Sequence, residues 1–582
     1  MGRSGVPAWR RWLPGLAQIV PPSPGAWRAD ALAGISVAIV MIPSVLAYAE
    51  LVGLAPAVGL YAAIGSMVVY SFLTQSRRVI VGPDTTVALL AAAVIAPLAA
   101  GDATRAAALA ATLAIMSGVV LLAAARLGLG QVADVLARPV LVGYANGAAF
   151  VLIASQLSAL FGVPLPRDGF VLRMIDGAAA LPRAHTPTLL LGLALIAMLL
   201  ALRAWLPRAP AALVACLVAA AAMAAFDLRS DGVATLRAID AGLPSPSLPD
   251  VTFSDVRSLA AGSLALAFLV FAEGVLLART LAERHRESVD PAVELRALGA
   301  ANVAAGIVGG FNVGASGSRS ITADAAGGRT QGTQLVALAV LVAFTLYAAP
   351  ILVYLPRVAL AAILIVAAIN LLDIAGTREL HRMERHAFWL ANLVTVGVLV
   401  LGVLPGMLIG VALAFAEVLV EVARPRDAVL RRSPGDGRFH DLDDDLPGTS
   451  PPGVVVYRLY APLVFANARH VADRLRTLAG TVDPPARLVV LDLQAVWEMD
   501  VTAAQVLADL HDELELAGVD LRFARANRPL REQMVRMLDG HGASHERFFP
   551  SASAAVDDFL AQDNPAASRP RQETGSGSTV DE

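Results

Sequence analysis

Long apolar runs recur along most of the chain and constrain its fold more than any other feature. Examples are Leu32–Leu51, Leu189–Leu206 and Ala387–Leu404, and 57% of the 582 residues are hydrophobic while only 16% are charged. Each run is long enough to cross the ~30 Å hydrocarbon layer of a bilayer as a helix. A soluble protein of this size could not bury so much apolar surface, so we expect lipid to surround most of the chain.

Composition divides the chain into an N-terminal tail at 1–29, a membrane zone at 30–424, a linker at 425–452, a soluble zone at 453–561 and a C-terminal tail at 562–582. The N-terminal tail has basic residues and a short apolar piece broken by prolines, which makes a poor cleavable signal. The linker is charged and rich in Pro and Gly. The C-terminal tail is predicted to be disordered.

The membrane zone contains roughly fourteen hydrophobic segments, two of them short and interrupted by Gly or Pro. Arginines cluster in alternate loops, for example at Arg77 and Arg78 and in the range 279–296. The positive-inside rule therefore predicts that these loops and both termini are cytoplasmic. Arginines also occur at 162–186, which this scheme places outside and does not explain.

An internal repeat relates the two halves of the membrane zone. RVIVGPDTTVALLAAA (78–93) and GFNVGASGSRSITADAA (310–326) share a β-like piece, a VG pair, polar residues and a short helix. Each half holds an odd number of spans, about seven, so the halves have opposite topology. The β-like pieces must be buried because lipid cannot satisfy their backbone groups. We expect the two short helices to meet with their N-termini facing each other.

Arg319 lies near the start of the second short helix, between strongly apolar segments. A helix N-terminus carries about half a positive charge and free N–H groups, so two facing N-termini form an anion site. An arginine at a membrane helix centre costs about 2.5–3.5 kcal/mol on insertion scales, so it needs a partner or a purpose. One interpretation is a salt bridge to Glu273. We favour a small anion bound by Ser316, Ser318, Arg319 and the helix dipoles.

Several motifs occur in order: DALAGISVAIVMIPSVLAYAELVGLAP (30–56), VGP (81–83), FAEGVLLAR (271–279), and SGSRS (316–320) with GGRTQ (327–331). With them the chain resembles the SulP anion permeases, the family of pendrin and prestin. The resemblance implies a polytopic α-helical membrane protein of seven-plus-seven inverted repeats, as in nucleobase permeases. It further implies a core of spans 1–4 and 8–11 that moves against a gate of the other spans, and a homodimer in the cell membrane.

The resemblance places the substrate between the first span, the two short helices and the eighth span. The corresponding residues in this sequence are Tyr48, Ser318 and Arg319, with Glu273 as the glutamate of the eighth span, and we expect Ser44, Thr85 and Ser316 to contact the substrate as well. Ser44 replaces a glutamine that is common after the proline, so the size of the substrate can differ.

Two carboxylates near this site each have two interpretations. Asp84, where many members have a small or apolar residue, is either a plain N-cap worth about 1 kcal/mol or a site for a coupling cation or proton. Glu273 lies in the apolar run Leu259–Ala278, where a carboxyl is costly to ionise. It is either a proton carrier or a fixed counter-ion to Arg319. We favour a coupling proton over sodium.

The soluble zone alternates strands, at 453–460, 486–494 and 519–526, with helices at about 467–479, 501–517, 529–538 and 552–561. It resembles a STAS domain, the α/β module fused behind SulP permeases and akin to anti-sigma factor antagonists. Asp500 is expected to be an N-cap. Thr502 matches the position phosphorylated in the antagonists, although Ala503 replaces the usual glycine, so regulatory phosphorylation is the less favoured interpretation.

We therefore expect a secondary active transporter of small anions, with sulfate as the first candidate and proton coupling. The alternatives are a sodium-coupled bicarbonate or dicarboxylate transporter, a chloride or anion exchanger, a non-transporting anion sensor and a nucleobase permease. An enzyme is not expected, because all nine histidines lie outside the spans or at their edges and Cys216 is the sole cysteine. We also expect no catalytic residues, metal, cofactor or nucleic-acid partner.

Overall fold

The computed structural model describes residues 13–19, 26–129, 138–165, 169–206, 209–236, 242–441, 448–538 and 544–563. Most of the N-terminal tail, and the predicted disordered tail from 564 onward, lie outside the described residues. The chain divides into two compact units, Met1–Ala414 and Phe415–Glu582, which are considered one at a time.

The first unit, here the membrane unit, is helical. Its first half contains α2 (Pro14–Ile19), α3 (Ala26–Val52), α4 (Pro56–Leu73), α5 (Thr85–Ala99), α6 (Ala103–Arg126), α7 (Arg138–Phe161), α8 (Phe170–Ala180), η2 (Leu181–Arg183), α9 (Thr186–Trp205) and α10 (Ala211–Ala225). Its second half contains α11 (Phe253–Arg284), α12 (Pro291–Ile307), α13 (Gly317–Ala325), α14 (Gly332–Ala343), η3 (Phe344–Ala348), η4 (Ala349–Tyr354), α15 (Arg357–Leu371), α16 (Ile374–Met383), α17 (Arg385–Leu401) and α18 (Val403–Ala423).

The predicted number of membrane segments is confirmed for the described residues. Eight helices are long and apolar enough to cross a membrane, and α5, α10, α14 and α17 are shorter apolar helices. With α12 and the short α13 they make fourteen segments in chain order. Local chemistry sets where several begin: Asp102 accepts a hydrogen bond from Thr104 N at the start of α6, and Thr252 and Asp255 form a capping box at the start of α11.

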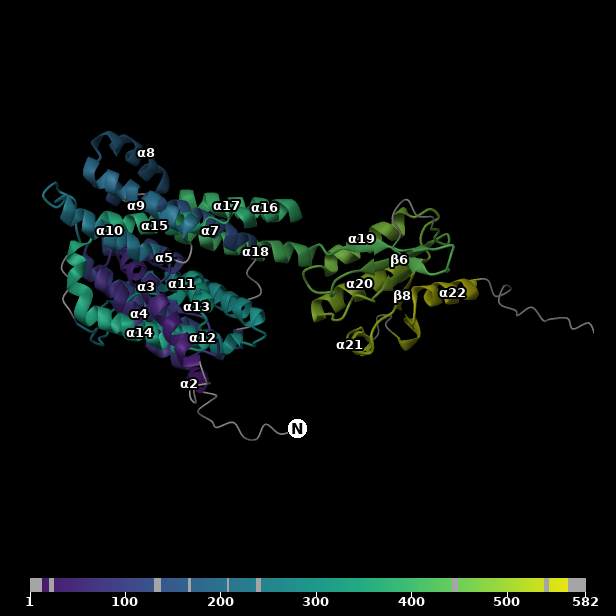
Figure 1. Cartoon of the computed structure of the whole chain (residues 1–582). Coiled ribbons are helices and arrows are strands. Elements are labelled where there is room, and N and C mark those ends of the chain that lie inside the picture. Colours follow the sequence, from purple (N-terminus) through teal and green to yellow (C-terminus); the bar gives the residue numbers. More distant parts are fainter. Residues whose placement is uncertain are drawn as a thin grey trace, which may run out of the picture. The chain divides into compact units, whose positions relative to one another are not determined.

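The helices of the membrane unit form two groups (Figure 1). In the first, the core group, α12 packs against α4 and α6, α14 packs against α3, and α5, α11 and α13 fill the remaining positions. In the second, the gate group, α7 packs against α15 and α17, and α9 packs against α10 and α15. The groups meet where α3 contacts α10 and α15. The core group therefore consists of spans 1–4 and 8–11, as the family resemblance implies.

Small residues allow α6 and α12 to approach closely inside the core group. A Cβ added at Gly118 of α6 would lie 2.6 Å from the carbonyl oxygen of Gly299 on α12. Such contacts are typical of membrane helices, where backbone packing replaces the hydrophobic effect as the driving force.

Two short strands cross the interior of the core group. β1 (Val81–Gly82) pairs antiparallel with β2 (Gly314–Ala315), with Val81 opposite Ala315 and Gly82 opposite Gly314. All four residues are buried, as predicted. Buried side chains complete the backbone hydrogen bonds, since Val81 N donates to Gln334 Oε1 at 2.8 Å.

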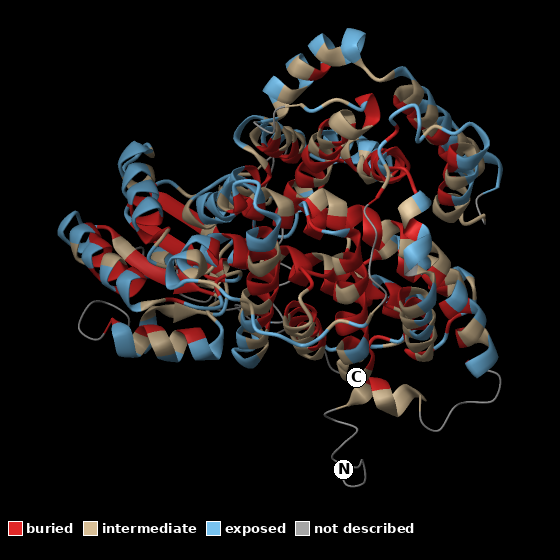
Figure 2. Ribbon diagram, turned by 90° about the vertical axis from the view of Figure 1, so that its left-hand side faces the viewer, coloured by how far each residue is buried: buried red, intermediate tan, exposed pale blue. Residues whose placement is uncertain are grey.

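The outer faces of the membrane unit are apolar and exposed. In Figure 2 the buried residues gather where helices pack against one another, while the outward faces are half-buried or exposed. Leu190, Leu264 and Trp389 are among the large apolar side chains on these faces. An apolar exterior over a better-buried interior is what lipid as solvent requires.

The second unit, here the soluble unit, is an α/β domain. Its strands are β3 (Asp427–Val429), β4 (Arg431–Arg432), β5 (Phe439–His440), β6 (Val454–Leu459), β7 (Leu488–Asp492), β8 (Asp520–Ala524) and β9 (Phe548–Phe549). Its helices are α19 (Ala468–Thr481), α20 (Val501–Leu516), α21 (Arg528–Met537), η5 (His545–Arg547) and α22 (Ala552–Asp563). The three predicted strands and four predicted helices are all present.

A five-stranded sheet of order β3-β6-β7-β8-β9 forms the centre of the soluble unit. The pairs from β6 to β9 are parallel, while β3 is antiparallel to β6. One hydrophobic cluster contains residues of α19, α20 and α21 together with the sheet, and a second contains residues of α22 and β5.

Part of the predicted linker at 425–452 folds with the soluble unit. β3 adds an edge strand to the sheet, and β4 pairs with β5. Leu430 and Phe439 are 0% and 5% exposed, and both belong to the second cluster. Its charge and its Pro and Gly content indicate a linker, and the strand that pairs with β3 begins more than twenty residues later, so local composition does not reveal the pairing.

Candidate substrate site

The starts of α5 and α13 lie side by side within the core group, each directly after a buried strand. Asp84 and Ser316 occupy the N-cap positions, and in the described part of the chain neither side chain accepts a hydrogen bond from a backbone N–H group of its own helix. Nη2 of Arg319, in the first turn of α13, is 3.8 Å from Oδ1 of Asp84 at the start of α5. The first N–H groups of both helices are therefore available to a ligand.

Arg319 is fully enclosed yet poorly partnered. Its residue is 2% exposed, and Nε, Nη1 and Nη2 are all buried without a hydrogen-bond partner among the described residues. The contact with Asp84 is too long for a hydrogen bond. Burying a guanidinium without hydrogen-bond acceptors is unfavourable in free energy. The site therefore suits a ligand that accepts hydrogen bonds from Arg319.

Hydroxyl groups surround the two helix starts. Thr85 Oγ1 donates to the buried Tyr48 OH at 2.8 Å, and Ser316 Oγ lies 3.4 Å from Ser318 Oγ. Ser44 lies one turn before Tyr48 on α3, and its Oγ donates to a carbonyl of its own helix at 2.9 Å. The structure thus brings Tyr48, Thr85, Ser316 and Ser318 to the helix starts, and the Ser44 hydroxyl lies beside that of Tyr48 while donating within α3.

The two carboxylates meet at Thr86. Glu273 Oε2 accepts a hydrogen bond from Thr86 Oγ1 at 2.8 Å, and Asp84 Oδ2 lies 3.5 Å from the same hydroxyl. The interpretation of Glu273 as the counter-ion of Arg319 is wrong, because the acid beside Arg319 is Asp84. Asp84 occupies the N-cap position of α5, but its carboxylate lies beside Arg319 and the Thr86 hydroxyl and makes no capping hydrogen bond to the helix backbone.

Tyr144 was missed by the sequence analysis. It lies on α7 in the gate group, is 2% exposed, and donates from its OH to the carbonyl oxygen of Thr86 at 3.1 Å. The available signal was a hydroxyl-bearing aromatic residue within an apolar segment, which does not by itself distinguish a core position from a site.

The predicted N-cap of α20 in the soluble unit is confirmed. Asp500 Oδ1 accepts from Ala503 N at 2.7 Å. Thr502 is exposed in the first turn of this helix. Its phosphorylation remains a prediction.

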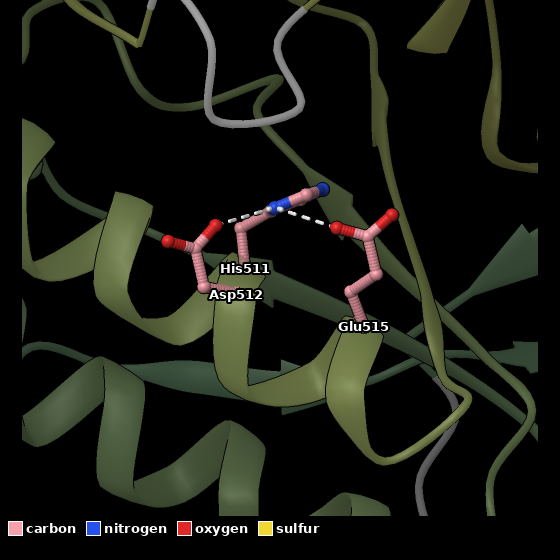
Figure 3. A group of neighbouring side chains, drawn as sticks. All are labelled: His511, Asp512 and Glu515. Atoms are coloured by element: carbon pink, nitrogen blue, oxygen red, sulfur yellow. Dashed lines mark hydrogen bonds and ion pairs between the residues drawn. The ribbon is translucent and has the colours of Figure 1, made fainter.

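His511, Asp512 and Glu515 form a group that superficially resembles a metal site (Figure 3). His511 Nδ1 lies 3.3 Å from Asp512 and 4.0 Å from Glu515. The other ring nitrogen is 2.6 Å from Nη1 of Arg547, whose Nη2 is also 4.0 Å from Glu515. A guanidinium this close disfavours a second cation, so we interpret the group as an ion-pair network.

Comparison with known proteins agrees with this geometry. Residues 27–394 match the model of the sulfate permease family, and residues 449–543 match that of the STAS domain. A probable sulfate transporter of Mycobacterium tuberculosis is 40% identical over 550 residues, which cover 94% of this chain and 98% of that protein. Sulfate transporter 4.1, chloroplastic, of Arabidopsis thaliana is 26% identical over 548 residues, covering 91% and 80%.

Solved structures show the same fold. Murine Solute Carrier 26 family member A9, an anion transporter in the inward-facing state, is 21% identical and superimposes with a TM-score of 0.89, covering 97% of each chain. The transmembrane domain of the cyanobacterial bicarbonate transporter BicA, also 21% identical, superimposes with a TM-score of 0.59 and covers 67% of this chain and 98% of that one.

These matches identify a transporter family and not an enzyme. The chain belongs to the sulfate permease family: it is a multi-pass helical membrane protein that ends in a STAS domain.

Proposed function

We propose that the protein carries sulfate across the cell membrane, coupled to protons. The observation that carries the proposal is Arg319, whose guanidinium is buried where the starts of α5 and α13 meet and finds no hydrogen-bond partner in the part of the chain that the structure describes. A divalent oxyanion suits this site because it accepts several charge-assisted hydrogen bonds at once. The names of the similar proteins from Mycobacterium tuberculosis and Arabidopsis thaliana support sulfate as the anion.

The anion is bound between Arg319, the free N–H groups of α5 and α13, and the hydroxyl groups of Tyr48, Thr85 and Ser318. The proposed site residues lie on α3, α5, α11 and α13, which are all in the core group. A displacement of the core group against the gate group therefore carries the intact site between the two sides of the membrane, which is alternating access.

Coupling is assigned to Glu273 and Asp84. Both carboxylates lie within 3.5 Å of one hydroxyl, that of Thr86, at the edge of the anion site. Two carboxylates repel an anion bound beside them. Protonation of one of them removes part of this repulsion and therefore favours binding of the anion. Sodium coupling with bicarbonate or a dicarboxylate as substrate is the alternative, favoured by the fold shared with a bicarbonate transporter. Exchange of chloride or another anion is a further alternative.

The orientation with both termini in the cytoplasm and assembly as a homodimer are parts of the same proposal. The first rests on the distribution of arginines between loops. The second rests on the family resemblance. The STAS domain is expected to regulate transport.

The test is sulfate binding to the full-length protein with Arg319→Ala. Charge-assisted hydrogen bonds contribute about 1.5–3 kcal/mol, so the affinity for sulfate is expected to fall by about tenfold or more. Arg105→Ala is the matched control, because Arg105 is half-exposed and pairs with Asp255, and these two residues lie at the starts of α6 and α11 and not at the starts of α5 and α13. Unchanged affinity in Arg319→Ala, with the fold retained, would refute the proposed site.

A further inference from the structure

A cavity of about 590 Å³ lies between the core group and the gate group, beyond the substrate site. Its wall combines Leu89 and Ala93 of α5 with Val151 and Ser155 of α7. Leu89 is one helical turn beyond Thr85, so the cavity begins about 6 Å along α5 from the substrate site. The cavity therefore lies between the substrate site and the side of the membrane unit where α3 ends, and an anion could reach the site through it.

An ion pair joins the two groups at this cavity. Arg357, the first residue of α15, donates from Nε and Nη2 to Glu50 of α3, with distances of 3.2 Å and 3.0 Å to Oε2 and 3.4 Å from Nη2 to Oε1. Both residues line the cavity. The Arg357 side chain is 54% exposed and that of Glu50 is 20% exposed, so the pair stands where the cavity meets solvent.

Each partner is anchored in its own group. Arg357 N donates to the carbonyl oxygen of Ala234 at 2.9 Å. An isolated β-bridge between Thr235 and Pro356 connects the same two segments. Glu50 is two residues beyond the site residue Tyr48 on α3. A shift of α3 against α15 by more than a hydrogen-bond length must therefore break the pair.

The corresponding arginine of the other inverted half makes a different contact. Arg138 begins α7 as Arg357 begins α15, and it pairs with Glu379 of α16 at 2.5 Å. α16 packs against α17 and α7 of the gate group, so both partners of this pair belong to that group and move together. The ion pair between Glu50 and Arg357 differs from this one because it connects the core group to the gate group.

We propose that Glu50 and Arg357 form a latch that holds the core group to the gate group on the side where α3 ends. The latch opens when the site turns toward that side, and Arg357 then presents a free guanidinium to the incoming anion along the cavity. The inference rests on the proposed movement of core against gate.

The test uses the full-length protein in lipid nanodiscs, where both faces are accessible, with Cys216→Ala and a reporter cysteine from Ala93→Cys in the cavity wall. The rate of labelling by a charged maleimide is measured without anion. Glu50→Gln and Arg357→Gln are each expected to accelerate labelling by about two- to fivefold, the change in state ratio that a partly exposed ion pair supports. Glu379→Gln, which breaks the pair inside the gate group, is the matched control and is expected to leave the rate unchanged.

The double variant Glu50→Arg with Arg357→Glu restores an ion pair with its charges exchanged. It therefore distinguishes loss of the latch from a general destabilisation of the fold as the cause of faster labelling. Restoration of slow labelling supports the latch, and failure to restore it overturns the latch. Unchanged labelling in both single variants, or equal acceleration in Glu379→Gln, overturns it as well. Sulfate binding is measured on the same samples, so a failure of the proposed substrate appears as absent binding whatever the labelling rates.

Discussion

At the scale of single residues, Asp84 and Glu273 are the groups that a bound anion must accommodate. Asp84 is 3.8 Å from Arg319, whereas Glu273 reaches the site through the Thr86 hydroxyl. Asp84 therefore competes with the anion for the guanidinium, and Glu273 does not.

Replacing each carboxylate by its amide is expected to have a different effect at Asp84 than at Glu273. Asp84→Asn removes the competing charge beside the buried Arg319 and is expected to tighten sulfate binding by several-fold, which corresponds to about 1 kcal/mol. Glu273→Gln is expected to leave binding intact and to abolish accumulation driven by a pH gradient. Uptake into proteoliposomes under a pH gradient, and separately under a sodium gradient, tests both variants. Accumulation by Glu273→Gln under the pH gradient would contradict its role as the proton carrier.

At the scale of elements, the position of α13 and β2 depends on how closely α6 and α12 pack, because both helices belong to the core group that encloses the strands. Gly118 and Gly299 allow this approach. The substrate site is thus supported by a helix pair that contributes none of its proposed ligands.

A methyl group at Gly118 is expected to destabilise the membrane unit. Its Cβ would lie 2.6 Å from the carbonyl oxygen of Gly299, which cannot move without its helix, and overpacking of this kind costs about 1–3 kcal/mol. Gly397→Ala in α17 is the control, because its nearest contact would be an ordinary 3.7 Å. Thermal unfolding of the two variants in detergent gives the comparison, and an equal melting temperature for both would contradict the packing argument.

At the scale of the whole molecule, transport chemistry and regulation are assigned to different units. All the proposed substrate and coupling residues lie in the membrane unit, before Ala414. The soluble unit begins earlier than composition indicates, because β3 belongs to its sheet.

Two truncations test this division. A chain ended after Arg424 removes the whole sheet and is expected to remain monodisperse, with the same preference for sulfate over chloride as the full-length protein. A chain ended after Pro452 retains β3 without β6, leaving an unpaired strand and the apolar Leu430 exposed, and is expected to aggregate. Size-exclusion chromatography and competition uptake provide the readouts. An altered anion preference in the first truncation would show that the soluble unit shapes the substrate site.

Four features could be predicted from the amino-acid sequence: the lipid environment, the number of membrane segments, the burial of the short strands and the α/β character of the soluble zone. These follow from apolar run lengths and from local periodicity, which do not depend on distant partners. The motif order likewise pointed to the residues at the starts of α5 and α13, since those residues are close in sequence to the strands that position them.

The pairing of the charged residues depends on the fold. Asp84 and Arg319 come from different halves of the membrane unit, and Thr86 and Glu273 are 187 positions apart, so no spacing rule connects either pair. The same holds for Glu50 with Arg357, for Tyr144 with Thr86, and for β3 with β6. The physical reason is that a buried charge or strand edge takes the partner that packing brings within hydrogen-bond distance, and that distance is set by the fold and not by the chain.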